Sequence, residues 1–192
     1  MQQRPYLLKN GVIYDGTGSS PEQADVLIVG ARISQVGKIR GADVPARPVI
    51  IECEGLCVSP GFIDMHSHSD SGLPLYPEAE CLIRQGITTS IGGNCGSSAA
   101  GIPYDDEAGW RPYLEAGLEK WNGLSEFLNA IDAIQPAVNL GMLIGHGDLR
   151  RTVSSETGSP LDCAQRAHLN LLMKEAILQG SFGVSSGLEY VP

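Results

Sequence analysis

The residues of this sequence best suited to chemistry are two closely spaced histidines. His66 and His68 follow the largely apolar run Phe62-Ile63-Asp64-Met65. Alternate side chains of an extended strand share a face, so we expect both imidazoles, together with Asp64, to point the same way. Neutral imidazole is a common ligand of zinc and related ions. The spacing therefore predicts a metal site. The alternative is a pair of ordinary polar residues on a solvated strand.

Cys95 is a candidate third ligand. It stands in the glycine-rich run Gly92-Gly93-Asn94-Cys95-Gly96. Glycine permits a sharp turn, and a nearby dication would hold the thiol as a thiolate. An inert buried thiol and a nucleophilic cysteine remain alternatives. The other cysteines are irregularly spaced, show neither a disulfide framework nor a zinc ribbon, and are interpreted as small buried hydrophobic residues. They are Cys53, Cys57, Cys81 and Cys163.

Two different patterns must position these residues. Before Pro60, short apolar runs separated by turn residues predict a small β module. The predicted strands are 6–8, 12–14, 26–29, 33–36 and 49–51, with turns at Asn10-Gly11, Asp15-Gly16 and Gly30-Ala31. After Pro60, apolar runs alternate with helical segments, which predicts βα units and a parallel sheet. Its strands are expected at 62–66, 87–91, 138–144 and 182–185.

Three helices are expected between these strands. One covers 78–85, one starts at Ser125 and ends near Ile134, and one opens at Ser159-Pro160 and ends at Gly180. His168 falls on the apolar side of the last helix and is assigned a packing role. The segment 104–122 is expected to be an excursion that covers a site or forms a surface helix.

In parallel α/β barrels, functional groups collect where strands end. Besides the histidines and Cys95, two further segments follow predicted strands. They are 145–148 and 185–190.

Composition narrows the class of protein. The 192 residues are 42% hydrophobic and 18% charged, as in an ordinary globular protein. Thirteen basic against 22 acidic residues give a net charge of -9, which disfavours nucleic acids and anionic membranes as partners. Neither a membrane span nor a signal-peptide core is visible, so a cytoplasmic protein is expected. A small polar or anionic substrate is compatible with this charge.

Four motifs, taken in order, resemble the N-terminal portion of an N-acyl-D-amino-acid deacylase (D-aminoacylase) of the amidohydrolase superfamily. The resemblance runs from about Leu8 to the last residue. The motifs are Pro60-Gly61-Phe62-Ile63-Asp64-Met65-His66-Ser67-His68, the run from Gln85-Gly86-Ile87-Thr88-Thr89 to Gly93-Asn94-Cys95-Gly96, Gly145-His146-Gly147-Asp148-Leu149-Arg150, and Gly183-Val184-Ser185-Ser186-Gly187-Leu188-Glu189-Tyr190-Val191-Pro192.

The resemblance implies a metal-dependent (β/α)8 barrel of the TIM type joined to a β-sandwich. Residues 1–59 would then be the N-terminal part of the sandwich, and residues 60–192 the N-terminal half of the barrel, with about four βα units. The implied reaction is zinc-dependent hydrolysis of the amide bond of an N-acyl-D-amino acid, which releases a carboxylate and a D-amino acid.

The resemblance also implies roles for single residues. Cys95 would bind the tightly held zinc, while His66 and His68 would serve a weaker or vacant neighbouring position. Tyr190 would orient the scissile carbonyl of the small-molecule substrate. His146 and Arg150 would be structural.

The family pattern is incomplete in this chain. Its two further zinc-binding histidines and its catalytic aspartate have no counterpart here, so we expect that the chain alone neither binds zinc tightly nor turns over substrate. A missing C-terminal half or self-association would complete it. Two alternatives stay open: a cyclic-amide hydrolase of the hydantoinase or dihydroorotase kind, although no lysine lies near 182–190, and a non-catalytic half of a split enzyme or pseudoenzyme.

Overall fold

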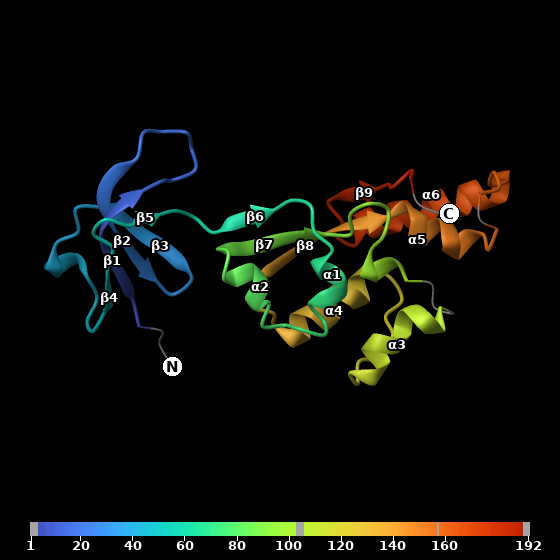
Figure 1. The fold of residues 1–192 in the computed structure, drawn as a ribbon, viewed down its shortest axis with the longest axis horizontal. Coiled ribbons are helices and arrows are strands. Elements are labelled where there is room, and N and C mark those ends of the chain that lie inside the picture. Colours follow the sequence, from blue (N-terminus) through green and yellow to red (C-terminus); the bar gives the residue numbers. More distant parts are fainter. Residues whose placement is uncertain (1–3, 103–105, 157, 190–192) are drawn as a thin grey trace. The chain divides into compact units, whose positions relative to one another are not determined.

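The computed structural model describes residues 4–102, 106–156 and 158–189 (Figure 1). The chain divides into two compact units, Met1–Pro60 and Gly61–Pro192. Each unit is described by itself.

The first unit is a β module. One sheet has the strand order β3-β2-β1-β4, and β5 also pairs with β1. β1 is antiparallel to β2 but parallel to β4. Leu7, Val26, Leu27 and Cys53 are among its buried residues. The elements are β1 (Tyr6–Ile13), β2 (Glu22–Val29), β3 (Arg32–Gly37), the 3-10 helix η1 (Gly41–Asp43), β4 (Val49–Glu52) and β5 (Cys57–Val58).

The predicted turn at Asn10-Gly11 is wrong, because β1 runs through these residues with an irregularity in its register. Asn10 takes a positive φ of 60°, and its N–H donates to the buried Asp25 carboxylate at 2.9 Å. A Cβ at position 11 would meet Val58 Cγ2 at 2.7 Å, so a larger residue there would force Val58 to shift. The predicted turn at Gly30-Ala31 is confirmed, since it joins β2 to β3.

The second unit contains a four-stranded sheet in the order β6-β7-β8-β9, and every pair is parallel. This confirms the predicted parallel arrangement. The strands are β6 (Phe62–Asp64), β7 (Ile87–Gly92), β8 (Asn139–Gly145) and β9 (Gly183–Ser185). The helices are α1 (Ser69–Gly72), α2 (Glu80–Ile83), the 3-10 helix η2 (Ala99–Gly101), α3 (Glu107–Glu115), α4 (Leu124–Ile134), α5 (His146–Val153) and α6 (Cys163–Leu178).

Two predicted helix starts are wrong. Gly123, not Ser125, is the residue before α4. The α6 helix begins after Asp162, whose carboxylate accepts the N–H of Gln165 while the Gln165 side chain accepts the N–H of Asp162. This reciprocal capping box satisfies two backbone donors, which Ser159-Pro160 would not do from its place three residues earlier.

The expected apolar side of α6 is also wrong, because His168 is exposed. The residues of α6 that pack inward are Leu169, Leu172, Met173 and Ala176, which form a helical stripe rotated away from His168. The cysteines differ as well. Four cysteines were expected to be buried. Cys53 is buried, but Cys57, Cys81 and Cys163 are exposed.

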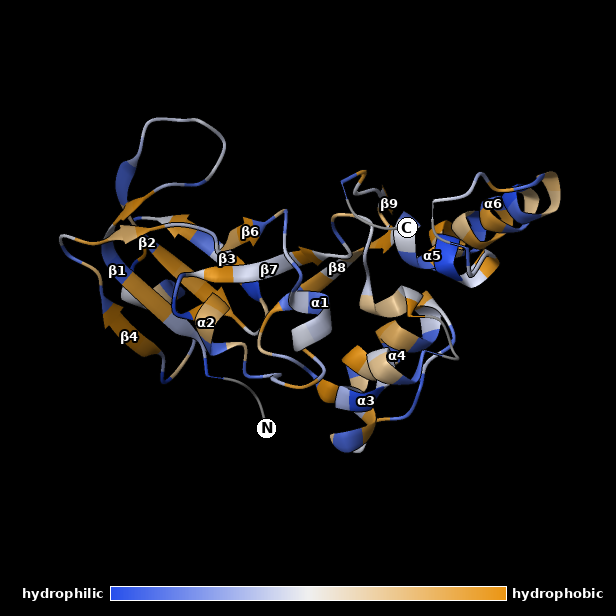
Figure 2. Cartoon of the chain, turned by 45° about the vertical axis from the view of Figure 1, so that its right-hand side comes forward, coloured by the Kyte–Doolittle hydropathy of each residue, from blue (hydrophilic) through white to orange (hydrophobic). Residues whose placement is uncertain are grey.

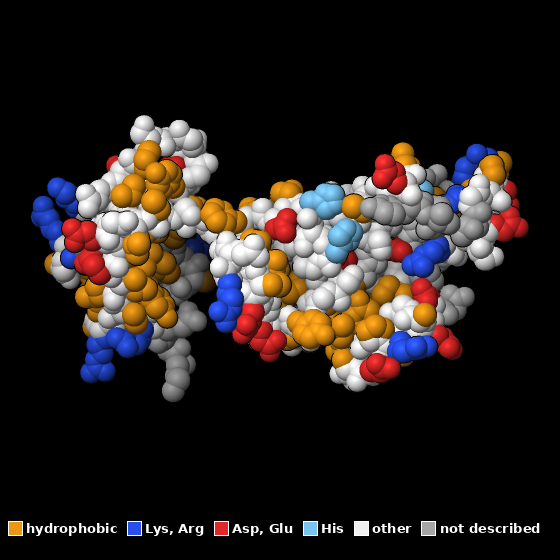
Figure 3. All heavy atoms as spheres, viewed as in Figure 1, with side chains coloured by type: hydrophobic (Ala, Val, Ile, Leu, Met, Phe, Trp, Pro, Cys, Tyr) orange, Lys and Arg blue, Asp and Glu red, His pale blue; other side chains and the backbone are white. Residues whose placement is uncertain are grey.

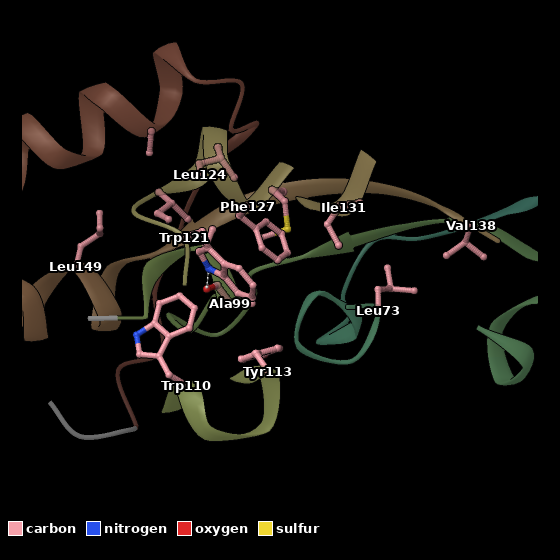
Figure 4. Packing of buried hydrophobic residues seen from close by; sticks show 14 of the residues in the cluster. Leu73, Ala99, Trp110, Tyr113, Trp121, Leu124, Phe127, Ile131, Val138 and Leu149 are labelled. Carbon is pink, nitrogen blue, oxygen red and sulfur yellow. Dashed lines mark hydrogen bonds between the residues drawn. The ribbon is translucent and has the colours of Figure 1, made fainter. Parts of the chain in front are cut away.

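An aromatic cluster anchors the core of the second unit (Figure 4). Trp121 is its centre, with ring centroids 4.8 Å from Trp110, 4.9 Å from Tyr113 and 5.1 Å from Phe127, each in an edge-to-face arrangement. Its indole N–H donates to the carbonyl of Ala99 at 2.8 Å. The segment expected to be a covering excursion or surface helix therefore supplies core residues.

Hydrophobic residues are concentrated on the strands and on the helix sides that form the core. In Figure 2, the hydrophobic colour is concentrated on strands such as β8 and on one side of α4. Phe62 and Ile63, on the edge strand β6, are among the exposed large hydrophobic residues, each 60% exposed. Among the described residues, no helix is both long and apolar enough to cross a membrane.

Candidate metal centre

The two histidines lie in the connection between β6 and α1. β6 ends at Asp64, and His68 is the residue before the first turn of α1. The expectation that both extend the strand is therefore wrong. The Asp64 carboxylate accepts the backbone N–H of His66 at 3.2 Å. The imidazole rings nevertheless lie close together, with centroids 6.2 Å apart.

Cys95 joins the histidines from the loop after β7. Its sulfur lies 3.1 Å from His66 Nε2, and one ligand atom from each of His66, His68 and Cys95 lies within 4.8 Å of the others. Both histidines are exposed and Cys95 is half-buried. Histidine side chains can be seen on the surface of this unit in Figure 3. Within the described ranges, this is the one cluster of three or more potential metal-binding side chains.

The loop that carries Cys95 turns sharply. Cys95 has a φ of +55°, and it lies between Gly93 and Gly96, which have φ values of +75° and +80°. The neighbouring Asn94 is buried, and its amide donates to the carbonyls of Ile91 at 2.8 Å and Ser67 at 3.2 Å. Since Ser67 stands between the two histidines, Asn94 links the cysteine loop to the histidine segment.

The turn from β8 into α5 supports the same loop. The N–H groups of Gly147 and Asp148 both donate to the carbonyl of Gly96, at 2.9 and 3.3 Å. In return, the buried Asp148 carboxylate accepts the N–H of Ser98. Sequence analysis placed Asp148 at a strand end but did not predict this role, which depends on contact with a loop 50 residues away.

Opposing effects act on Asp148. Burial raises the pKa of its carboxyl, while the hydrogen bond from Ser98 and the charge of Arg151 lower it, and the net shift is upward. Arg151 donates to Asp148 Oδ1 at 2.8 Å and lies 3.5 Å from Asp106. This carboxylate is therefore engaged in holding loops together.

Asp70, two residues after His68, is a second buried carboxylate, 1% exposed. Its Oδ2 accepts the N–H of Ala99 at 2.8 Å, whereas Oδ1 is buried without a hydrogen-bond partner among the described residues. A side chain on Gly92 would meet Asp70 Cβ at 2.6 Å, so glycine is needed for this close approach.

A cavity of about 770 Å³ opens beside the cluster. His68 and Cys95 line one part of it, and His146, Arg150 and Arg151 line another. Arg150 also donates to the carbonyl of Ser159. Tyr190, the candidate for orienting a substrate carbonyl, lies outside the described residues.

The donor set fits a borderline metal ion. Imidazole nitrogen and thiolate sulfur suit zinc, whereas calcium and magnesium prefer oxygen ligands. A tetrahedral zinc ion separates a nitrogen and a sulfur ligand by about 3.6 Å. The 3.1 Å between His66 Nε2 and Cys95 Sγ is close to that value, so a small side-chain adjustment would admit an ion.

Comparisons with known proteins place this geometry in context. Residues 49–164 match the model of the amidohydrolase family. The chain is 36% identical to an N-acyl-D-aspartate deacylase and 32% identical to a D-aminoacylase, both from Alcaligenes xylosoxydans xylosoxydans. These matches cover 99% and 97% of the chain but only 38% of each relative.

Solved structures agree. An N-acyl-D-glutamate deacylase from Bordetella bronchiseptica, in complex with zinc and a phosphonate inhibitor, superposes with a TM-score of 0.85 at 30% identity, covering 96% of this chain and 38% of the other. A D-aminoacylase structure gives a TM-score of 0.84 at 32% identity, with 96% and 39% covered. A dihydroorotase from Bacillus subtilis is 41% identical, but over only 33% of this chain and 14% of the relative.

Proposed function

Because this chain belongs to the amidohydrolase family, we propose that it forms part of a zinc-dependent deacylase of N-acyl-D-amino acids. The reaction hydrolyses the amide bond and releases a carboxylate and a D-amino acid. The observation that carries this proposal is the convergence of His66, His68 and Cys95 within 4.8 Å. The D-amino-acid substrate class is supported by the names of relatives that match along nearly the whole chain.

In this proposal, Cys95 is a ligand of a tightly held zinc ion, and His66 and His68 are ligands of a weaker neighbouring position, which the Cys95 sulfur, 3.1 Å from His66 Nε2, would share. Zinc supplies Lewis acidity, which polarises a carbonyl group and lowers the pKa of water to about 7. Tyr190 would orient the carbonyl of the substrate. Arg150 and Arg151 line the adjacent cavity, where Arg150 donates to the carbonyl of Ser159 and Arg151 pairs with Asp148 and Asp106.

We also propose that residues 60–192 are the N-terminal half of a (β/α)8 barrel and residues 1–59 the N-terminal part of a β-sandwich. The parallel order β6-β7-β8-β9 and the unit boundary after Pro60 support this assignment. β9 pairs with β8 alone among the described strands, and Phe182 beside it is 75% exposed. Further polypeptide, from a C-terminal half or a second chain, would cover this edge and supply the remaining ligands.

The test uses the 192-residue chain, its Cys95→Ser variant and, as a matched control, Cys163→Ser at an exposed cysteine of α6. We expect the wild type and the control to bind added zinc weakly in equilibrium dialysis, because the remaining ligands are missing, and Cys95→Ser to bind it at least tenfold more weakly still, as expected for loss of a ligand. Equal zinc binding by all three proteins would overturn the assignment of Cys95.

Activity is tested separately with N-acetyl-D-aspartate and other N-acetyl-D-amino acids. We expect no turnover by the zinc-loaded chain alone, and turnover after addition of a polypeptide that corresponds to the rest of the Alcaligenes N-acyl-D-aspartate deacylase. Turnover by the chain alone would refute the need for completion. Failure of every complemented mixture would favour a pseudoenzyme.

The cyclic-amide alternative has less support. The dihydroorotase match covers a third of the chain. The bridging lysine that such enzymes would need has no candidate among the described residues of β9 and the turn after it.

A further inference from the structure

We propose that Ser185, at the end of β9, is a positioning residue that sets the location of the Cys95 sulfur. The inference rests on the proposed function, in which Cys95 is a metal ligand. Sequence analysis noted that Ser185 follows a strand but gave it no role.

One hydroxyl group closes the cysteine turn from both sides. The Ser185 Oγ accepts the N–H of Gly96 at 2.9 Å and donates to the carbonyl of Gly93. A serine hydroxyl has one proton to donate and two lone pairs to accept, so it can make both of these bonds at the same time. Asn94 and Cys95 are the only residues between the two bridged peptides, and the bridge spans about 90 residues of sequence.

The remaining contacts leave this turn little freedom. The carbonyl of Gly96 accepts the N–H of Gly147, and the side chain of Asn94 is bonded to Ser67. Gly93 lies so close to β8 that an added Cβ would stand 1.9 Å from the carbonyl oxygen of Leu143. Among these contacts, the Ser185 bridge is the one that joins the two ends of the turn, Gly93 and Gly96, through a single side chain.

The conformation of Cys95 makes this bridge necessary. A φ of +55° is unfavourable for a residue with a side chain and persists when surrounding contacts enforce it. Gly93 and Gly96 are both buried. Removal of the hydroxyl leaves the N–H of Gly96 and the carbonyl of Gly93 without this partner, and we expect the turn to shift as these groups take new partners. Any such movement displaces Cys95 Sγ from His66.

A general stabilising role of Ser185 would predict something different. If the hydroxyl only fastens β9 to its neighbours, its loss lowers the stability of the fold but leaves the thiolate in place whenever the chain is folded. The decisive readout is therefore a spectroscopic property of the sulfur itself. Cobalt(II) bound to a thiolate has a sulfur-to-metal charge-transfer absorption that is absent when only imidazoles bind.

The experiment compares Ser185→Thr with Ser185→Val in the full chain. These side chains have nearly the same shape, but only threonine retains a hydroxyl. Ser186→Ala is the positional control, because the exposed Ser186 makes no side-chain hydrogen bond to the described residues. Each variant is titrated with Co²⁺ alone, and folding is checked by circular dichroism.

We expect Ser185→Val to bind Co²⁺ about 10-fold to 100-fold more weakly than wild type, as for loss of an outer contact to a ligand, with reduced thiolate charge transfer. Ser185→Thr and Ser186→Ala should match wild type. Equal affinity and equal charge transfer in the folded Val and Thr variants would overturn the proposal.

A second readout separates failure of this inference from failure of the proposed function. If wild type shows no thiolate absorption with Co²⁺, the metal role of Cys95 fails. Alkylation of the metal-free chain by iodoacetamide, followed peptide by peptide with mass spectrometry, then decides the role of Ser185. Faster alkylation of Cys95, but not of Cys163, in Ser185→Val relative to Ser185→Thr supports positioning. Equal rates overturn it.

Discussion

Replacing Gly93 with alanine should destabilise the fold far more than the same replacement at a matched glycine. Gly93 has a φ of +75°, and an added Cβ would lie 1.9 Å from the carbonyl oxygen and 2.8 Å from the carbonyl carbon of Leu143. Gly117 has nearly the same φ, +80°, but no heavy atom within 4 Å of an added Cβ. Comparing alanine at these two positions therefore separates the cost of backbone strain from the cost of the steric clash with Leu143.

The expected magnitudes follow from these two contributions. A left-handed conformation costs a residue with a side chain about 1–2 kcal/mol, and this cost applies at both positions. Alanine also restricts the unfolded chain equally in both variants. Overpacking adds about 1–3 kcal/mol at Gly93 alone, and we expect the upper end because backbone, rather than the tip of a flexible side chain, would have to move. Gly93→Ala should thus lose about 3–4 kcal/mol and Gly117→Ala about 1 kcal/mol.

Urea denaturation of the two variants and the wild-type chain, followed by circular dichroism, measures the difference. The comparison of midpoints is valid if the slopes of the transitions agree. Equal destabilisation by the two replacements would refute the close approach of Gly93 to β8, and with it the location of the Cys95 loop. A larger loss at Gly117 would refute the reasoning from added contacts altogether.

Further predictions concern the core, a buried carboxylate and a helix end. Trp121→Ala should cost about 3–5 kcal/mol in urea denaturation, because a 3% exposed indole is removed from three ring contacts, whereas Leu114→Ala, 46% exposed, should cost under about 1 kcal/mol; similar losses would contradict a core role for this segment. Burial raises the pKa of Asp148, so the contribution of this carboxyl to stability should be full below pH 3.8 and decline as pH rises through the raised pKa. The free energy of unfolding of wild type and of Asp148→Asn, measured between pH 3 and 7, should therefore depend differently on pH. The same pH dependence in both proteins would contradict the raised pKa. Asp162→Ala, which removes the capping box, should lower the free energy of unfolding by about 1 kcal/mol in thermal unfolding, whereas Ser159→Ala should change it by less than about 0.5 kcal/mol. The reverse ranking would support the helix start expected from sequence.

Sequence patterns located most elements of the second unit because these patterns are local. The four parallel strands lie within about two residues of the predicted runs at both ends, since continuous apolar runs between helical segments favour buried parallel strands. One error arose because pairing with distant strands overrode local turn chemistry. Asn10-Gly11 has turn chemistry, yet pairing of β1 with β2 on one side and with β4 and β5 on the other holds it in a strand.

The candidate site shows the same division. Residue types and spacing identified His66, His68 and Cys95 as potential ligands. Metal binding by these residues stays a prediction. The argument from strand alternation did not apply, because β6 ends before either histidine. Their proximity instead depends on hydrogen bonds that sequence spacing does not encode, such as that from Asn94 to Ser67.

The sequence by itself determined which side chains are available and located the four parallel strands to within about two residues, because donor chemistry and runs of apolar residues belong to neighbouring positions. Only the tertiary structure decided that Cys95 lies 3.1 Å from a histidine 29 residues earlier, and that Ser185 bridges the turn around it. The physical reason is that burial, left-handed backbone and long-range hydrogen bonds are satisfied jointly, by partners that meet only after parallel strands set their register.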